Sequence, residues 1–146
     1  MRVYMDLCSL KRPFDDAAQP RVRLEAEAVL SILEAPAERV TFLRSSALDL
    51  ENAQNPVELR AARVSEWLNT LPMLAMDAAT IESDVRKLVS VGFAGFDALH
   101  LASAEAVAAD VFVTCDERLV TRAAQVTNVL RVRVVDPITL AKELNP

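Results

Sequence analysis

Four acidic residues stand at points where strands are expected to end or helices to begin. Asp6 follows the apolar run "RVYM", and Asp116 follows "VFVTC". Asp97 opens the helical run "DALHLASAEA", and Glu51 lies in the short stretch that comes after "RVTFLR". Carboxylates gathered in one place repel and raise one another's pKa values, so a protein that gathers them usually supplies a cation. Oxygen ligands of this kind suit Mg²⁺ or Mn²⁺.

Each of these acids also has an ordinary structural interpretation when taken alone. Asp97 could cap its helix, because aspartate is a favoured N-cap residue. Asp6 and Asp116 could be turn residues at strand ends. Glu51 could be a solvated helix residue, as we expect of Asp49 two positions earlier. The metal-site hypothesis therefore depends on whether the fold brings the four acids together.

The apolar periodicity predicts strands and helices in alternation. The expected strands are 2–5, 39–44, 110–115 and 132–135; the expected helices are 21–34, a short helix that carries Glu51, 57–71, 78–91, 97–108, 117–125 and 138–144. Residues 7–20, which include two prolines, are expected to form a loop. This order predicts an α/β fold of three layers, with a mostly parallel central sheet and helices on both faces.

A sheet of this kind binds ligands beyond the carboxyl ends of its strands. Asp6 and Asp116 would both lie at such ends. Glu51 would follow in the helix after the second strand, and Asp97 would lie at the start of a later helix. We therefore expect these four acids to converge on one edge of the sheet.

Composition limits the classes of protein that fit. The 146 residues are enough for a single domain spanning 1–146, and 52% of them are hydrophobic. Only two glycines, Gly92 and Gly95, are present, which disfavours a glycine-rich phosphate loop. Two cysteines, Cys8 and Cys115, are too few for a disulfide framework, so a cytoplasmic location is expected. No apolar run approaches the roughly 20 residues of a membrane span, and no signal peptide is evident.

The net charge of −5 argues against a protein that holds nucleic acid mainly by electrostatic attraction. An enzyme that touches nucleic acid briefly is still compatible with this charge, because bound cations change the local field. Five arginines could contact phosphates: Arg12, Arg44, Arg60, Arg63 and Arg118.

Three segments together resemble the PIN domain family, and in particular its VapC-type toxin ribonucleases. They are "VYMDLCSLKRPFDD", "SSALDLENAQNP", and "GFAGFDALHLASAEAVAADVFVTCDERL" followed by "VRVVDP". They span nearly the whole chain in the family's order. The resemblance implies a three-layer PIN-like fold, and it matches the family's acidic residues to Asp6, Glu51, Asp97 and Asp116. It also implies that Thr114 is a polar neighbour of the acids.

The resemblance implies a Mg²⁺- or Mn²⁺-dependent endoribonuclease that hydrolyses phosphodiester bonds of single-stranded or looped RNA. It would be the toxin of a toxin–antitoxin pair, bound by a cognate antitoxin and forming a homodimer. Asp6 and Asp97 would be the main metal ligands, Asp116 would complete the site, and Glu51 would be a ligand or the general base. The alternative is a non-catalytic PIN-like module whose acids bind a divalent ion for stability or partner docking.

His100 is the only histidine and lies one helical turn after Asp97. This spacing could place both side chains on one helix face, and imidazole is a common metal ligand. The resemblance instead gives the position a structural role, so we expect a hydrogen bond from His100 to the backbone or to a neighbouring element. Trp67 is expected in the core or in a dimer contact rather than as a platform for a base.

Overall fold

The structure, a computed structural model, describes residues 1–146, and its centre is a sheet of four parallel strands. Their order is β2-β1-β3-β4. The strands are β1 (Arg2–Met5), β2 (Thr41–Phe42), β3 (Val111–Val113) and β4 (Arg133–Val135). The predicted α/β class with a parallel sheet is confirmed.

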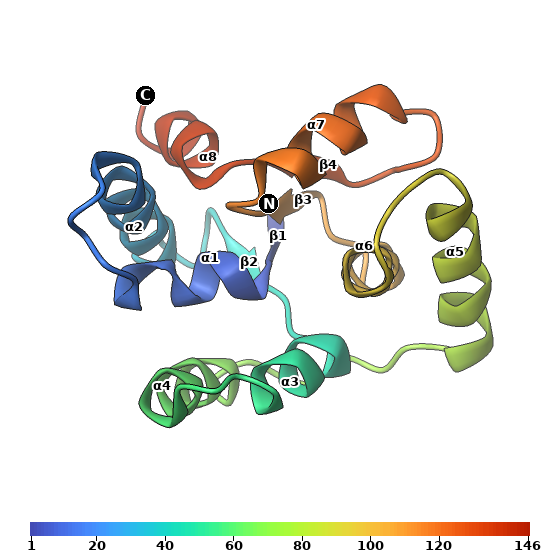
Figure 1. The fold of residues 1–146 in the computed structure, drawn as a ribbon, viewed down its shortest axis with the longest axis horizontal. Helices are drawn as coiled ribbons and strands as arrows, with labels where there is room; N and C mark the ends of the chain where they lie inside the picture. The colour runs from blue at the N-terminus through green and yellow to red at the C-terminus, as the bar shows by residue number, and fades with distance from the viewer.

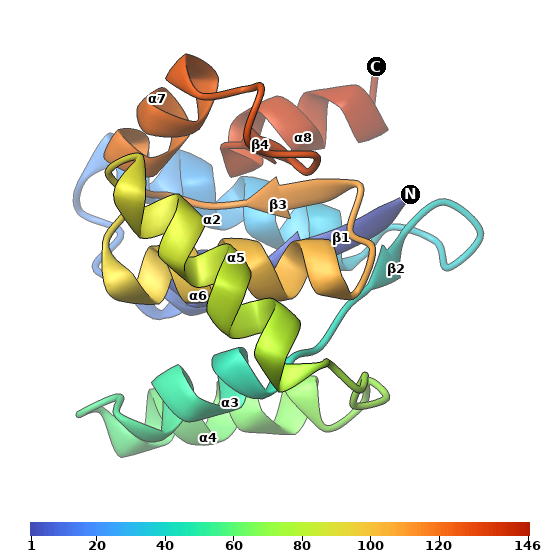
Figure 2. The ribbon, with the colours of Figure 1, turned by 90° about the vertical axis from the view of Figure 1, so that its right-hand side faces the viewer.

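Helices cover both faces of this sheet and extend beyond it. They are α1 (Leu7–Lys11), a 3₁₀ turn η1 (Arg12–Phe14), α2 (Pro20–Leu33), α3 (Ser46–Ala53), α4 (Glu58–Leu68), α5 (Ala78–Ser90), α6 (Gly95–Ala106), α7 (Glu117–Gln125) and α8 (Pro137–Leu144). Figure 1 shows α2 and α8 on one side of the strands and α5 and α6 on the other. In Figure 2, α5 lies in front of α6, which in turn lies in front of β3. The predicted three-layer arrangement is confirmed, and no helix is long and apolar enough to cross a membrane.

The two central strands explain the position of the core. All of β3 and all of β1 except Arg2 are buried, since helices cover both faces of a parallel sheet. Tyr4 of β1 stacks on Phe112 of β3 with ring centroids 5.3 Å apart, and both side chains are fully buried. The sheet thus holds the carboxyl ends of β1 and β3 side by side, with Met5 in register with Val113.

The prediction of a loop over 7–20 was wrong in its first half. Asp6 accepts a hydrogen bond from the Leu7 amide and caps α1, while Leu7 and Leu10 bury their side chains. Pro13 then lies in the first turn of η1, where a proline costs no helical hydrogen bond. The prolines and aspartates of residues 7–20 favoured a loop, although the apolar spacing of the first residues is compatible with a helix.

Two predicted boundaries also moved. The strand expected over 39–44 pairs with β1 only at Thr41 and Phe42, because the chain then turns away toward α3. The helix expected from residue 97 begins at Gly95, with Ala94 as its N-cap. Asp97 is therefore inside the first turn and does not cap the helix.

Candidate metal centre

The site lies where the chain connectivity reverses across the sheet. From β1 the chain passes to β2 on one side, and β3 then pairs with β1 on the other. The carboxyl edge between β1 and β3 is thus a switch point of the kind that binds ligands in open α/β sheets. Asp6 leaves β1 there, and Thr114 leaves β3 there. The Asp6 amide donates to the Val113 carbonyl at 2.9 Å, which holds the two segments together.

The Asp6 carboxylate is buried, with 7% of the residue exposed. Thr114 donates its hydroxyl to Oδ2 of Asp6 at 2.9 Å, and the Cys8 thiol lies 3.3 Å from the same oxygen. Burial raises the pKa of Asp6, while His100 and these two hydrogen bonds act in the opposite direction and Glu51 adds repulsion. The predicted position of Thr114 beside an acid agrees with this geometry.

Glu51 and His100 meet from α3 and α6. Nε2 of His100 contacts Oε2 of Glu51, and Nδ1 of the same ring lies 2.9 Å from the Tyr4 hydroxyl. One ligand atom each from Asp6, Glu51 and His100 lies within 4.8 Å of the others. The expected hydrogen bond from His100 to a neighbouring element is present, and its ring also lies within reach of a shared cation.

Asp97 lies one helical turn before His100 and is half-buried. Its pKa is raised to about 6 by burial and by the negative charges of Asp6 and Asp116, with a smaller contribution from Glu51 that His100 partly offsets. No hydrogen bond stabilises the ionised form of this carboxylate. The site therefore holds a negative charge for which the protein supplies no arginine or lysine.

Asp116 is exposed at the start of α7 and caps that helix. Its Oδ1 accepts hydrogen bonds from the amides of Arg118 at 2.9 Å and Leu119 at 3.3 Å. Thr114 accepts the Asp116 amide at 3.1 Å and so links the Asp6 and Asp116 segments. Asp116 acts on Asp97 through charge, but the oxygens of neither residue belong to the compact group formed by Asp6, Glu51 and His100.

The donor set fits a divalent cation. Carboxylate oxygens are the ligands that Mg²⁺ and Mn²⁺ prefer, and an imidazole beside them is compatible with Mn²⁺. The raised pKa values of Asp6 and Asp97 show that these carboxylates are held in positions that disfavour their charged forms. A cation at this edge would remove that unfavourable charge, so the residues present suit the ion that the sequence predicted.

Two similar solved structures report on the fold. VapBC-1 from nontypeable Haemophilus influenzae matches with a TM-score of 0.63 at 10% identity, over 94% of this chain and 98% of that chain. VapBC2 from Rickettsia felis, bound to a DNA fragment from its promoter, matches with a TM-score of 0.58 at 14% identity, over 93% and 98%. The chain has a PIN-like fold. No protein-family model and no curated protein matches the sequence, so the fold is the part of the resemblance that is confirmed.

The structure divides the candidate phosphate-binding arginines. Arg12, Arg44 and Arg60 are committed to ion pairs with neighbouring aspartates, and Arg63 pairs with Glu66 at the surface. Arg118 forms no ion pair and lies exposed two residues after Asp116. It is therefore the arginine of this group that is free to meet a ligand beside the acids.

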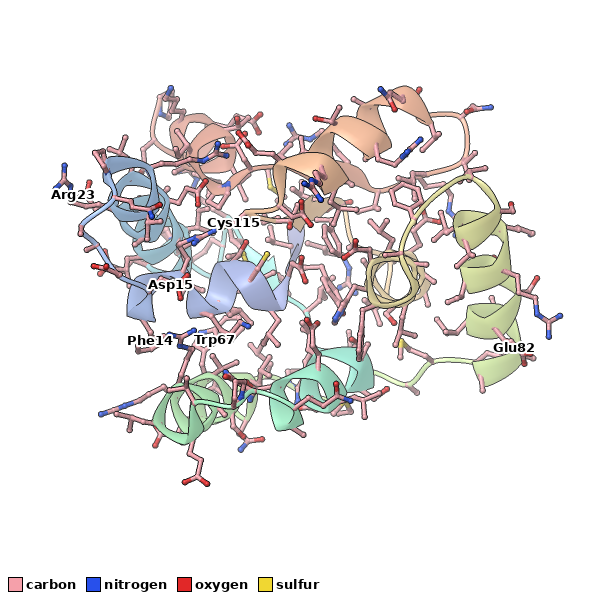
Figure 3. The ribbon with its side chains drawn as sticks, viewed as in Figure 1. Phe14, Asp15, Arg23, Trp67, Glu82 and Cys115 are labelled. Atoms are coloured by element: carbon pink, nitrogen blue, oxygen red, sulfur yellow. The ribbon has the colours of Figure 1, made fainter.

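The sequence analysis missed two polar residues behind the site, Tyr4 and Ser45. Their hydroxyls lie 2.7 Å apart, and both residues are fully buried. A usable signal was present, since a tyrosine inside a strand covered on both faces needs a hydrogen-bond partner for its hydroxyl. Cys115, labelled in Figure 3, follows β3 by two residues. Neither Cys115 nor Cys8 forms a disulfide.

Proposed function

We propose that this chain is a Mg²⁺- or Mn²⁺-dependent endoribonuclease that cleaves single-stranded or looped RNA and is the toxin of a toxin–antitoxin pair. The observation that carries the proposal is the group of acids at the sheet's switch point, with no arginine or lysine among them. The PIN-like fold and the neighbours named VapBC support the same class.

Each acid then has a distinct task. Asp6 is held by Thr114 and by the Leu7 amide, so it offers a fixed oxygen to the ion. Asp97 has no competing hydrogen bond and is the second main ligand. Glu51 is a ligand or the base that accepts a proton from the attacking water. Asp116 fixes the start of α7 and contributes charge from the solvent side.

When bound, the cation supplies positive charge that acidifies a water and offsets the charge that develops on the phosphodiester. The protein side chains do the rest of the work by orientation. One oxygen of Asp6 and one of Glu51 lie within 4.8 Å of each other, which keeps these two donors together, while burial of Asp6 limits access of bulk water. Arg118, which is exposed beside Asp116 and forms no ion pair, would hold a neighbouring phosphate of the RNA.

A protein partner and a homodimer belong to the same proposal. The neighbouring structures carry the name VapBC, which supports a cognate antitoxin for this chain. Exposed apolar side chains on α3, α4 and the segment before α5, namely Leu50, Leu59 and Met73, give partners a surface to cover. The alternative is a PIN-like module that binds the ion for stability or docking without catalysis.

Cleavage of single-stranded RNA separates the two possibilities. We expect Asp6→Asn and Asp97→Asn each to lower the cleavage rate by at least about 100-fold, the scale for losing one electrostatic or acid–base group. RNA affinity should hold or improve, because a negative charge facing the phosphates has gone. EDTA should abolish cleavage and Mn²⁺ restore it. Wild-type protein that cuts no RNA in Mn²⁺, or aspartate variants that cut as well as wild type, would favour the non-catalytic module.

A further inference from the structure

A chain of four polar side chains runs from the interior of the protein to the metal centre. Ser45 Oγ lies 2.7 Å from the Tyr4 hydroxyl, Tyr4 lies 2.9 Å from Nδ1 of His100, and Nε2 of His100 contacts Glu51. The first three residues are at most 1% exposed. Bulk water therefore does not reach these three residues, and the hydrogen-bond protons between them and Glu51 are placed by what each of the four groups can donate.

Proton placement follows from what each group can donate. A carboxylate accepts only, so the contact with Glu51 requires a proton on Nε2 of His100. Nδ1 of the neutral ring then accepts, and Tyr4 is its donor. Burial holds the pKa of Tyr4 well above its usual value, which keeps the phenol protonated for this purpose. Ser45 in turn donates to the Tyr4 oxygen, and every proton has an acceptor.

If these hydrogen bonds ran in the reverse direction, the buried Ser45 hydroxyl would be left without an acceptor. If Nε2 were bare and bound a cation, Nδ1 would donate to Tyr4, and Tyr4 would donate to Ser45. The Ser45 hydroxyl proton would then have no acceptor, because the Tyr4 hydroxyl is the one hydrogen-bond partner that the structure gives Ser45 Oγ. An unsatisfied buried hydroxyl is costly, about 1–3 kcal/mol. A bare Nε2 would also face the Glu51 carboxylate, lone pair against lone pair.

We propose that His100 is a positioning residue for Glu51 and not a ligand of the cation. Its Nε2–H holds Oε2 of Glu51, while Tyr4 and Ser45 fix the orientation of the ring. Glu51 thus presents its other oxygen, Oε1, to the ion or to the attacking water in a single arrangement. Aromatic packing supports the fixed ring, since Phe96 stacks on His100 and Tyr4 meets it edge-on.

This inference rests on the proposed function for the identity of the ion, but its main test needs no RNA. His100 is the only histidine, so its ring nitrogens give one unambiguous set of signals in ¹⁵N NMR. We expect a proton on Nε2 and none on Nδ1, both in the absence of divalent metal and at millimolar Mg²⁺. A ring with bare Nε2 in Mg²⁺, or with protons on both nitrogens, would overturn the proposal. A protein that shows the expected tautomer but cuts no RNA would contradict only the proposed function.

Substitutions supply a second readout, the Mg²⁺ affinity measured by thermal shift. Glutamine can place an amide N–H near the position of Nε2, whereas phenylalanine cannot donate. We expect His100→Phe to weaken Mg²⁺ binding about 10-fold, the lower end of the effect of residues that orient ligands, and His100→Gln to stay within about 3-fold of wild type. Equal losses in the two variants would contradict the role of the Nε2–H donor.

A matched control tests the far end of the chain. Ser45→Ala should keep the proton on Nε2, because Glu51 still accepts it, but should shift the Nδ1 signal, because the Tyr4 oxygen loses its donor and the Tyr4–Nδ1 hydrogen bond weakens. Ser103→Ala removes a hydroxyl that is equally buried in α6 but has no hydrogen-bond partner, so it should leave the histidine signals unchanged. An Nδ1 signal in Ser45→Ala that matches wild type would show that the Ser45–Tyr4 contact does not orient the ring.

Discussion

Glu25 and Asp6 are both buried acids, yet the protein treats their charges in opposite ways. Glu25 in α2 has 2% of its side chain exposed and is paired with Arg21 at 2.8 Å and Arg12 at 2.9 Å. Arg12 also pairs with Asp15, and Asp15 pairs in turn with Arg60 of α4. Asp6 is 7% exposed and receives hydrogen bonds only from Thr114, Cys8 and its own helix.

The difference shows which acids serve the fold and which do not. Around Glu25 the arginines of η1 and α2 balance the charge locally and tie these elements together. At the metal centre the pKa values of Asp6 and Asp97 are raised and no arginine or lysine compensates them. Burying a charge without a partner is costly, so a cation from outside would stabilise the second arrangement and not the first.

Removing the charge of Glu25 should give the largest change in stability. Glu25→Gln leaves Arg12 and Arg21 without their buried partner, and we expect it to lower the free energy of unfolding by about 3 kcal/mol. Urea denaturation in EDTA measures this. Glu143→Gln is a suitable control, because it removes an acid of an exposed pair with Arg133 and should leave the free energy of unfolding nearly unchanged. Comparable losses in the two variants would contradict the distinction between buried and exposed pairs.

Asp97→Asn should change the free energy of unfolding in the opposite direction and stabilise the protein. A folded-state pKa of about 6, above the unfolded value near 3.8, means that ionisation of Asp97 disfavours the folded state. This residue's contribution is therefore most favourable below about pH 4 and is lost as the pH rises through about 6. In EDTA at pH 7.5 we expect the asparagine variant to be more stable than wild type by about 1–2 kcal/mol, a value reduced for solvent screening.

The pH dependence provides the check on that interpretation. The stability difference between Asp97→Asn and wild type should shrink toward zero near pH 4, because the aspartate is then neutral in both states. Thermal melts between pH 4 and 7.5 would show this. A difference that does not change with pH would mean that the asparagine acts through packing and not through relief of repulsion.

The smallest expected effect concerns Arg118, which lies beside Asp116 and has no acidic partner. Arg118→Ala should weaken binding of single-stranded RNA about 3-fold and lower the slope of log affinity against log salt by about one. Arg63→Ala is the control, since Arg63 is an exposed arginine already paired with Glu66 on α4. Equal effects of the two substitutions in a fluorescence-anisotropy titration would remove Arg118 from the proposed RNA path.

The sequence predicted the sheet and most helices because their apolar periods are long and regular. It could not predict α1, since five residues with one buried turn give too little periodicity. The position of Asp6 followed from the rule for strand ends, which needs only the strand boundaries, whereas the place of Thr114 beside an acid followed from the family resemblance. The contact of His100 with Tyr4 and Glu51 joins three elements far apart in the sequence, and no local pattern encodes such a meeting.

The central claim is that the acids without arginine partners bind a divalent cation, and Mg²⁺ binding in the absence of RNA tests it most directly. Thermal melts of wild type should shift upward as Mg²⁺ rises to millimolar concentration, because the ion binds the folded state. Asp97→Asn should lose most of this shift. Asp49→Asn is the control, because Asp49 lies on the same helix as Glu51 but is already paired with Arg44, and this variant should keep the shift. An undiminished Mg²⁺ response in Asp97→Asn, or none in wild type, would contradict the account.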